Sequence, residues 1–156
     1  MTINLDETDI KILRLMQSNA RVSNVDLARE LNMAPSAVLE RVKKLEQKKV
    51  ITGYYTQINP VALQQKLLAF IFIKSSEGFT CNSKTAQLLS KIPEVQEVHH
   101  IAGEDCFLVK VRTEDSASLM NFMRSSLQKI PNIASTKTTI VLETVKEEQQ
   151  IVLSKK

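Results

Sequence analysis

Residues 35–48 combine small side chains with lysines, residue types that can contact nucleic acid. Two small side chains, Ser36 and Ala37, come near the start of this stretch, and two lysines, Lys43 and Lys44, follow about two helical turns later. Small side chains at a helix start can approach base edges, and lysine ammonium groups can bind phosphates or bases. Basic helix faces alone are most often solvated surface, so the elements that surround this stretch decide its interpretation.

The segment Gly103-Glu104-Asp105 is a second candidate site, because it places two carboxylates side by side next to a glycine. Adjacent carboxylates repel each other unless a cationic group or backbone donors neutralise them. The segment could therefore hold a cationic group of a ligand. The alternative, a solvated acidic turn with no ligand, is common and stays open.

The histidines and cysteines indicate neither a metal site nor a catalytic site. His99 and His100 are neighbours in an expected strand and face opposite sides of it, so we expect one packed ring and one ring that faces solvent or an interface. Cys81 and Cys106 are too few for a disulfide framework and lie at no metal-ligand spacing, so we expect reduced thiols. Cys106 has no evident general base, which favours a small core residue over a nucleophile.

Composition is typical of an ordinary globular protein. The 156 residues are 43% apolar and 24% charged, with a formal net charge of +4, and they include only three glycines and four prolines. These values exclude collagen-like and low-complexity chains. The longest apolar run, Leu67 to Ile73, is too short to span a bilayer, and the charged N-terminus is unlike a secretion signal. We therefore expect a cytoplasmic protein with no membrane partner.

Three short helices are predicted in the N-terminal third, and they must position the basic stretch. They are expected at 6–18, 24–31 and 35–48. Asp6 and Ser23 occupy N-cap positions with an aspartate three residues later, and Pro35 suits the first position of the third helix. The tight connection between the last two helices predicts a helix-turn-helix, whose second helix carries the basic face and would enter the major groove.

Two further features lie at the start of this helix-turn-helix and directly after it. The start of the second helix, at Ser23 and Asn24, either binds a phosphate through exposed backbone N–H groups or is a plain cap. After Lys49, β-forming residues around Gly53 predict a short strand or wing that ends at Asn59-Pro60.

The C-terminal part contains an internal duplication. The sequence Lys91-Ile92-Pro93 recurs as Lys129-Ile130-Pro131, 38 residues later, and the same offset aligns the apolar runs 69–74 and 107–112. Each copy reads as a strand, an amphipathic helix that ends near Ile-Pro, and a second strand. Two copies predict a βαββαβ, ferredoxin-like sandwich, with Gly103 in the hairpin between the halves.

In combination, these motifs resemble the leucine-responsive regulator/asparagine regulator (Lrp/AsnC) family of transcription factors along nearly the whole chain. The motifs are Leu5-Asp6-x-x-Asp9-x-x-Ile12-Leu13, Asn24-x-Asp26-Leu27-Ala28, Ser36-x-x-Leu39-Glu40-Arg41-Val42-Lys43-x-Leu45-Glu46, Ile51-x-Gly53-Tyr54, Asn59-Pro60, Ala102-Gly103-Glu104-Asp105-Cys106-Phe107-Leu108 and Thr136-Lys137-Thr138.

The resemblance implies a DNA-binding winged helix-turn-helix and a sandwich that forms dimers and rings of dimers, with a small effector, usually an amino acid, between dimers. We assign DNA contacts to Asn24, Ser36, Ala37, Arg41, Lys43 and Lys44. The resemblance assigns the effector site to Gly103, Glu104, Asp105, Cys106, Thr136 and Thr138. The family often has serine at the position of Ala34, and Asp-aromatic where this chain has Cys106-Phe107. An effector ammonium group would therefore need Glu104 or Asp105.

We thus expect an α+β protein with a winged helix-turn-helix domain at 1–60, a linker at 61–66 and a βαββαβ effector and oligomerisation domain at 67–156. The expected function is amino-acid-responsive DNA binding by a homodimer, assembled to an octamer or another ring, with no cofactor, metal or catalytic residue. One alternative is an enzyme like the sirohaem decarboxylases, which resemble this layout and bind a tetrapyrrole through His and Arg; His99 or His100 could serve there. Another is a DNA-binding regulator with no effector.

Overall fold

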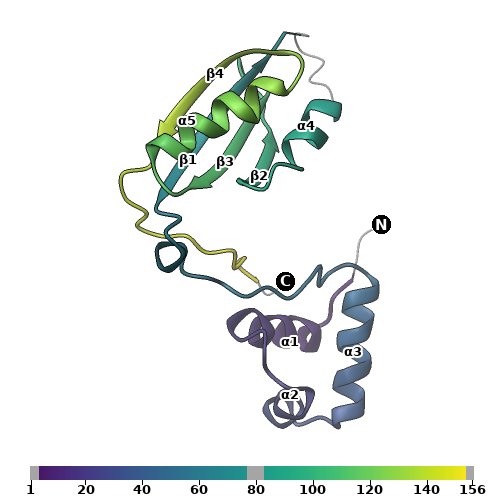
Figure 1. Cartoon of the computed structure of the whole chain (residues 1–156). Helices are drawn as coiled ribbons and strands as arrows, with labels where there is room; N and C mark the ends of the chain where they lie inside the picture. The colour runs from purple at the N-terminus through teal and green to yellow at the C-terminus, as the bar shows by residue number, and fades with distance from the viewer. Residues whose placement is uncertain (1–3, 77–82, 154–156) are drawn as a thin grey trace. The chain divides into compact units, whose positions relative to one another are not determined.

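The computed structural model describes residues 4–76 and 83–153 and separates into two compact units (Figure 1). The first, called here the helical unit, contains the chain up to Gln57 together with the C-terminal tail from Glu147. The second, called here the sandwich unit, spans Ile58–Lys146. Among the described residues, no helix is both long and apolar enough to cross a membrane.

Three helices form the helical unit, as predicted: α1 at Glu7–Ser18, α2 at Asn24–Leu31 and α3 at Pro35–Gln47. The carboxylate of Asp6 accepts a hydrogen bond from the backbone N–H of Asp9, and the Ser23 hydroxyl accepts one from that of Asp26. Asn32 ends α2 in the left-handed conformation, with φ of 51°, which an asparagine tolerates and which turns the chain directly into α3. The apolar faces enclose a core of Ile12, Leu27, Ala28, Val38, Val42 and Leu45.

Ala34, the N-cap of α3, provides no side-chain hydrogen bond to the helix. We expect Ala34→Ser to raise the free energy of unfolding by about 1 kcal/mol, because a serine oxygen can accept from an unsatisfied N–H group of the first turn. Chemical denaturation followed by circular dichroism would measure this. Ala20→Ser, in the exposed turn after α1, is the matched control. Equal effects of the two substitutions would contradict the prediction.

No strand forms in residues 50–58, so of the two predicted forms, a short strand or a wing, the strand is not found. The backbone N–H groups of Val50 and Ile51 instead donate to the carbonyl of Leu45 and close the end of α3. The Tyr54 hydroxyl donates to Glu46 at 2.8 Å, which holds the extended segment against α3. β-forming residues make a strand only where a second strand pairs with them, and the sequence pattern does not report whether one is present.

The C-terminal tail, which the sequence pattern placed with the sandwich, lies on α1 of the helical unit. The side-chain amide of Gln17 makes two hydrogen bonds with the backbone of Ile151. Its Nε2 donates to the carbonyl at 2.9 Å, and its Oε1 accepts from the N–H at 3.1 Å. Arg14 donates to the carbonyl of Leu153. The chain therefore joins the two units twice, once at Gln57–Ile58 and once at Lys146–Glu147.

The sandwich unit confirms the predicted βαββαβ order. Its elements are β1 at Leu67–Ser75, α4 at Ser83–Leu89, β2 at Val95–His100, β3 at Phe107–Thr113, α5 at Ser116–Ser125 and β4 at Ile133–Ile140. Short 3-10 helices precede β1, at Pro60–Leu63, and follow α5, at Leu127–Lys129. The strands form one antiparallel sheet in the order β2-β3-β1-β4.

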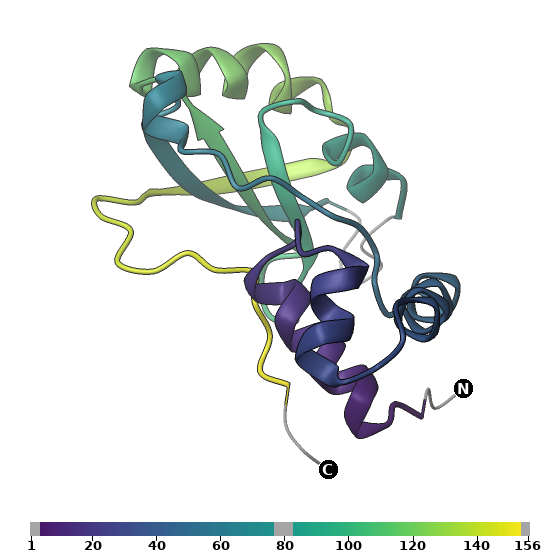
Figure 2. The same ribbon diagram turned by 90° about the horizontal axis from the view of Figure 1, so that it is seen from below.

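Helices α4 and α5 cover the same face of this sheet (Figure 1 and Figure 2). Alternate residues of β1 and β3, such as Ile71 and Val109, are fully buried against Leu89 of α4 and Phe122 of α5. The opposite face carries Phe70 and Phe72, which are only half-buried. The apolar alternation of each strand thus decides which face the helices cover.

Candidate functional site

The exposed side of α3 carries the lysines that the sequence singled out. Ser36, Lys43 and Lys44 are exposed, and the buried residues Val38 and Val42 lie on the other side of the helix. Ala37 is half-buried at the edge of this face. Helical periodicity therefore produces one polar surface that begins with small side chains and continues with cations, as a DNA-reading helix requires.

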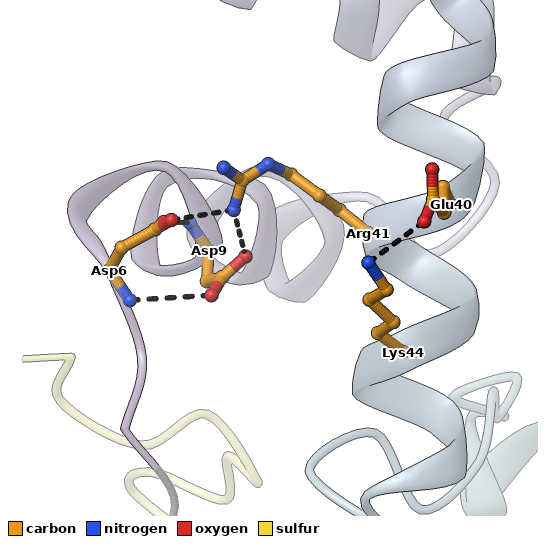
Figure 3. A network of polar contacts seen from close by, with 5 residues as sticks. All are labelled: Asp6, Asp9, Glu40, Arg41 and Lys44. Carbon is orange, nitrogen blue, oxygen red and sulfur yellow. Dashed lines mark hydrogen bonds and ion pairs between the residues drawn. The ribbon is translucent and has the colours of Figure 1, made fainter.

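Lys44 is paired within its own helix. Its Nζ lies 2.8 Å from Oε1 of Glu40, four residues earlier, and this hydrogen bond lowers the pKa of the Glu40 carboxyl (Figure 3). Both side chains are more than half exposed. Exposed pairs of this kind contribute little stability, so Lys44 can exchange Glu40 for a phosphate at small cost.

Arg41 lies beside Lys44 and Ala37, at the edge of this exposed surface, and its side chain reaches across to α1. Its Nη1 lies 2.7 Å from Oδ2 of Asp6 and 2.7 Å from Oδ1 of Asp9 (Figure 3). These hydrogen bonds raise the pKa of the Arg41 guanidinium. The pKa of Asp6 is lowered, first by the Asp9 N–H and then by Arg41. The structure thus pairs Arg41 within the helical unit, whereas the sequence had grouped it with the DNA-contacting residues.

The start of α2 has the geometry of a plain cap. Besides accepting from the N–H of Asp26, the Ser23 hydroxyl donates to the Asp26 carboxylate at 2.6 Å. Arg29 pairs with the same carboxylate at 3.2 Å. Asn24 is half-buried at the first position of the helix. A carboxylate beside this helix end disfavours an anion there, so the geometry favours the cap over a phosphate site.

The loop between β2 and β3, residues 101–106, contains the predicted ligand residues. Gly103 has φ of 145°, a conformation that L side chains rarely adopt. Glu104 is exposed and Asp105 half-buried, and among the described residues neither carboxylate has an ion-pair partner. In the part of the chain that the structure describes, the loop therefore presents two carboxylates outside any ion pair, on a backbone turn that favours glycine.

The sheet register brings part of the predicted ligand set to one end of β1. The N–H of Cys106 donates to the carbonyl of Ile73 at 2.8 Å, and Thr136 of β4 pairs with Ile73 from the other side. Thr136 is therefore one strand away from the loop. Thr138 lies two residues further along β4, and its hydroxyl donates to the sulfur of Met123 on α5 at 3.7 Å.

Comparison with known proteins decides the family. Residues 68–151 match the profile described as the Lrp/AsnC ligand binding domain, and residues 5–52 match one described as a winged helix-turn-helix DNA-binding domain. The chain belongs to the Lrp/AsnC family. It is a DNA-binding transcriptional regulator with a ligand-binding domain.

Similar Lrp/AsnC proteins align over nearly their whole length. The leucine-responsive regulatory protein of Haemophilus influenzae is 35% identical over 150 residues, which cover 96% of this chain and 90% of that protein. The Escherichia coli K12 protein of the same name is 32% identical over 151 residues, 96% and 92% of the two chains.

Solved structures of Lrp/AsnC proteins share the fold. A transcriptional regulator of Neisseria meningitidis, solved as its L-Met complex, superposes with a TM-score of 0.88 at 28% identity and covers 96% of this chain and 97% of its own. The AsnC structure of Escherichia coli gives a TM-score of 0.86 at 26% identity and covers 97% of this chain and 100% of its own.

The prediction for the two histidines of this Lrp/AsnC chain is wrong. Both histidines are exposed, although one was expected to be packed: His99 shares a hydrogen bond of 2.9 Å with Glu97, and the His100 ring lies 5.4 Å from that of Phe107. The first contact lowers the pKa of Glu97. β2 lies at the edge of the sheet, so its side chains have a neighbouring strand on one side only.

Cys106 is buried in the sandwich core as expected, but it is disulfide-bonded rather than a reduced thiol. A count of two cysteines argues against a disulfide framework and does not exclude a single bond. Cys81 lies outside the described residues. In the part of the chain that the structure describes, no group of His, Cys, Asp and Glu could hold a metal ion.

Proposed function

We propose that this protein is a sequence-specific regulator that reads DNA through α3 and responds to a small amino acid bound at the loop 101–106. The observation that carries the proposal is the exposed face of α3, where Ser36, Lys43 and Lys44 lie opposite the buried stripe. Lysine contacts to phosphates would supply salt-dependent affinity, and Ser36 and Ala37 near the helix start would supply sequence preference. Asn24 would support this contact from α2.

The effector is proposed to bind through its ammonium group. Glu104 and Asp105 provide the carboxylates for it, Gly103 allows close backbone approach, and Cys106, Thr136 and Thr138 border the same end of the sheet. The L-Met complex of the Neisseria regulator supports an amino acid as the ligand class. A coupling free energy of about 1–3 kcal/mol between effector and DNA would be enough to change occupancy.

A homodimer, assembled further to an octamer or another ring, completes the proposal. Two α3 helices about 34 Å apart would reach successive major grooves on one side of the duplex, and a ring could wrap a longer site. The half-buried Phe70 and Phe72 on the sheet face opposite the helices support association of sandwich units. The protein would act in the cytoplasm, where bacterial and archaeal DNA is found.

The proposal also holds that the chain is not an enzyme. The similar proteins are regulators. Titration of the purified protein with a tetrapyrrole would test the decarboxylase alternative. An absorption band that appears at stoichiometric addition would contradict the proposal.

Selection of bound DNA from random oligonucleotides, with and without a pool of amino acids, is the direct test. We expect a site with two related half-sites about one helical turn apart, and a change in its enrichment when the effective amino acid is present. Recovery of unrelated sequences would refute specific reading. Enrichment that no amino acid changes, together with no heat of binding in calorimetry, would support a regulator without an effector.

A further inference from the structure

Arg41 differs from Lys44, the neighbouring cation of α3, because its partners lie on another helix. Lys44 pairs with Glu40 of its own helix, whereas Arg41 pairs with Asp6 and Asp9 of α1. A single nitrogen, Nη1, lies between the two carboxylates, 2.7 Å from an oxygen of each (Figure 3). Distances of 2.7 Å are at the short end for charge-assisted hydrogen bonds.

The capping box of α1 fixes the two acceptors in advance. Oδ1 of Asp6 accepts from the N–H of Asp9 at 2.8 Å, and Oδ2 of Asp9 accepts from the N–H of Asp6 at 3.3 Å. Each carboxylate therefore uses one oxygen to begin α1 and the other to bind Arg41. Because the backbone of α1 holds both side chains, Arg41 meets an acceptor of fixed position and direction.

The location of Arg41 on α3 allows this contact to define the rotation of the helix about its axis. Arg41 lies at the edge of the buried stripe, directly before Val42, and its side chain is 33% exposed. Apolar packing of Val38, Val42 and Leu45 is not directional, so by itself it defines the rotation of α3 about its axis only weakly. A directional hydrogen-bonded contact at one edge of the stripe defines that rotation more sharply.

We propose that Arg41 is a positioning residue for DNA recognition. By binding the Asp6–Asp9 pair it sets the rotation of α3, and thereby the direction in which Ser36 and Lys43 face; it does not itself contact a phosphate. The inference rests on the proposed role of α3 in reading DNA. A phosphate that displaced the carboxylates from Nη1 would leave Asp6 and Asp9 unpaired beside the DNA, which electrostatics disfavours.

Three variants of the full-length chain distinguish positioning from phosphate binding: Arg41→Gln, Asp9→Asn and the control Lys43→Gln. Asparagine keeps a side-chain oxygen for the Asp6 N–H, so Asp9→Asn preserves that part of the capping box and removes the charge. The melting temperature of each variant is first measured by circular dichroism. Each variant is then titrated, at a temperature below its melting point, with the selected site and with a random duplex at several salt concentrations. The readouts are the slope of log affinity against log salt and the ratio of specific to random binding.

We expect Arg41→Gln and Asp9→Asn each to lower the specificity ratio about tenfold, the effect of misplacing one base contact, with the salt slope unchanged. The double variant should be no worse than Arg41→Gln alone, because that substitution already removes the contact with Asp9. The sign of the Asp9→Asn effect is decisive, since loss of a negative charge would otherwise strengthen DNA binding. Lys43→Gln should reduce the salt slope by about one.

A salt slope that falls for Arg41→Gln as it does for Lys43→Gln would overturn the positioning role and leave the DNA face intact. An unchanged specificity ratio in Asp9→Asn would also overturn it, and this reading remains available if Arg41→Gln does not fold. If Lys43→Gln changes neither readout, α3 is not the DNA face, and the proposed function itself fails.

Discussion

The double substitution Lys43→Ala/Lys44→Ala is expected to weaken binding to the selected DNA site and to flatten its salt dependence. Each lysine that neutralises a phosphate adds about 0.9 to the slope of log affinity against log salt, so loss of both should lower that slope by about two. Between 50 and 200 mM salt, the parent chain should then lose roughly tenfold more affinity than the variant. Fluorescence anisotropy with a labelled site measures both quantities.

The control for this prediction is Lys91→Ala/Lys129→Ala, which removes the same charge from exposed positions of the sandwich unit. A change in net charge alone would affect the two double variants equally. We expect the control to retain the parent affinity and slope. An unchanged slope in Lys43→Ala/Lys44→Ala would show that the exposed face of α3 does not contact the phosphate backbone.

The elements that the sequence predicted well are those defined by local signals. The starts of α1, α2 and α3 follow from Asp6, Ser23 and Pro35, because a helix cap depends on groups within four residues. The sandwich followed from a repeat, since two copies of one pattern support each other. In both cases the information lies in short segments of the chain.

Contacts between distant segments were not predictable. Asp6 and Asp9 were recognised only as cap residues, and nothing in their spacing indicates that Arg41, more than thirty residues later, binds the oxygens that the capping box leaves over. The amide of Gln17 likewise meets Ile151 across 134 residues. The prediction of a strand after α3 failed for the same reason. A strand needs a partner strand to pair with, and local composition does not specify whether one is present.

Part of the candidate ligand site could be predicted from the sequence, and part of it could not. Gly103 was identified from its place between the two copies of the repeat, and its φ of 145° explains why glycine suits that turn. The position of Thr136 beside Ile73 depends on the register of β4 against β1. A shift of one residue would turn the threonine to the other face, and only the packed core fixes that register.

Phe122→Ala is expected to have the largest effect on stability. The side chain is 1% exposed in the core between α5 and the sheet, so truncation removes its packing and leaves a cavity. Such substitutions cost about 3–5 kcal/mol, a large share of the roughly 5–15 kcal/mol that stabilises a typical protein. Met120→Ala on the same helix, where the side chain is 50% exposed, should change the free energy of unfolding by less than about 0.5 kcal/mol.

Tyrosine fluorescence can show which unit loses stability in Phe122→Ala. It has no tryptophan, and both tyrosines, Tyr54 and Tyr55, lie in the extended segment of the helical unit. In urea unfolding of Phe122→Ala, part of the far-ultraviolet circular dichroism signal should be lost at lower urea, because the helices and strands of the sandwich contribute to it, whereas tyrosine emission should change at the same urea concentration as in the parent chain. Coincident shifts in both signals would show that the two units unfold together. A decrease of less than about 1 kcal/mol in the free energy of unfolding would contradict the prediction and show that the core around Phe122 is loosely packed. Separate transitions would mean that a destabilised sandwich can unfold, together with the candidate ligand loop 101–106, while the helical unit stays folded, so the proposed effector response would fail before contact with DNA does.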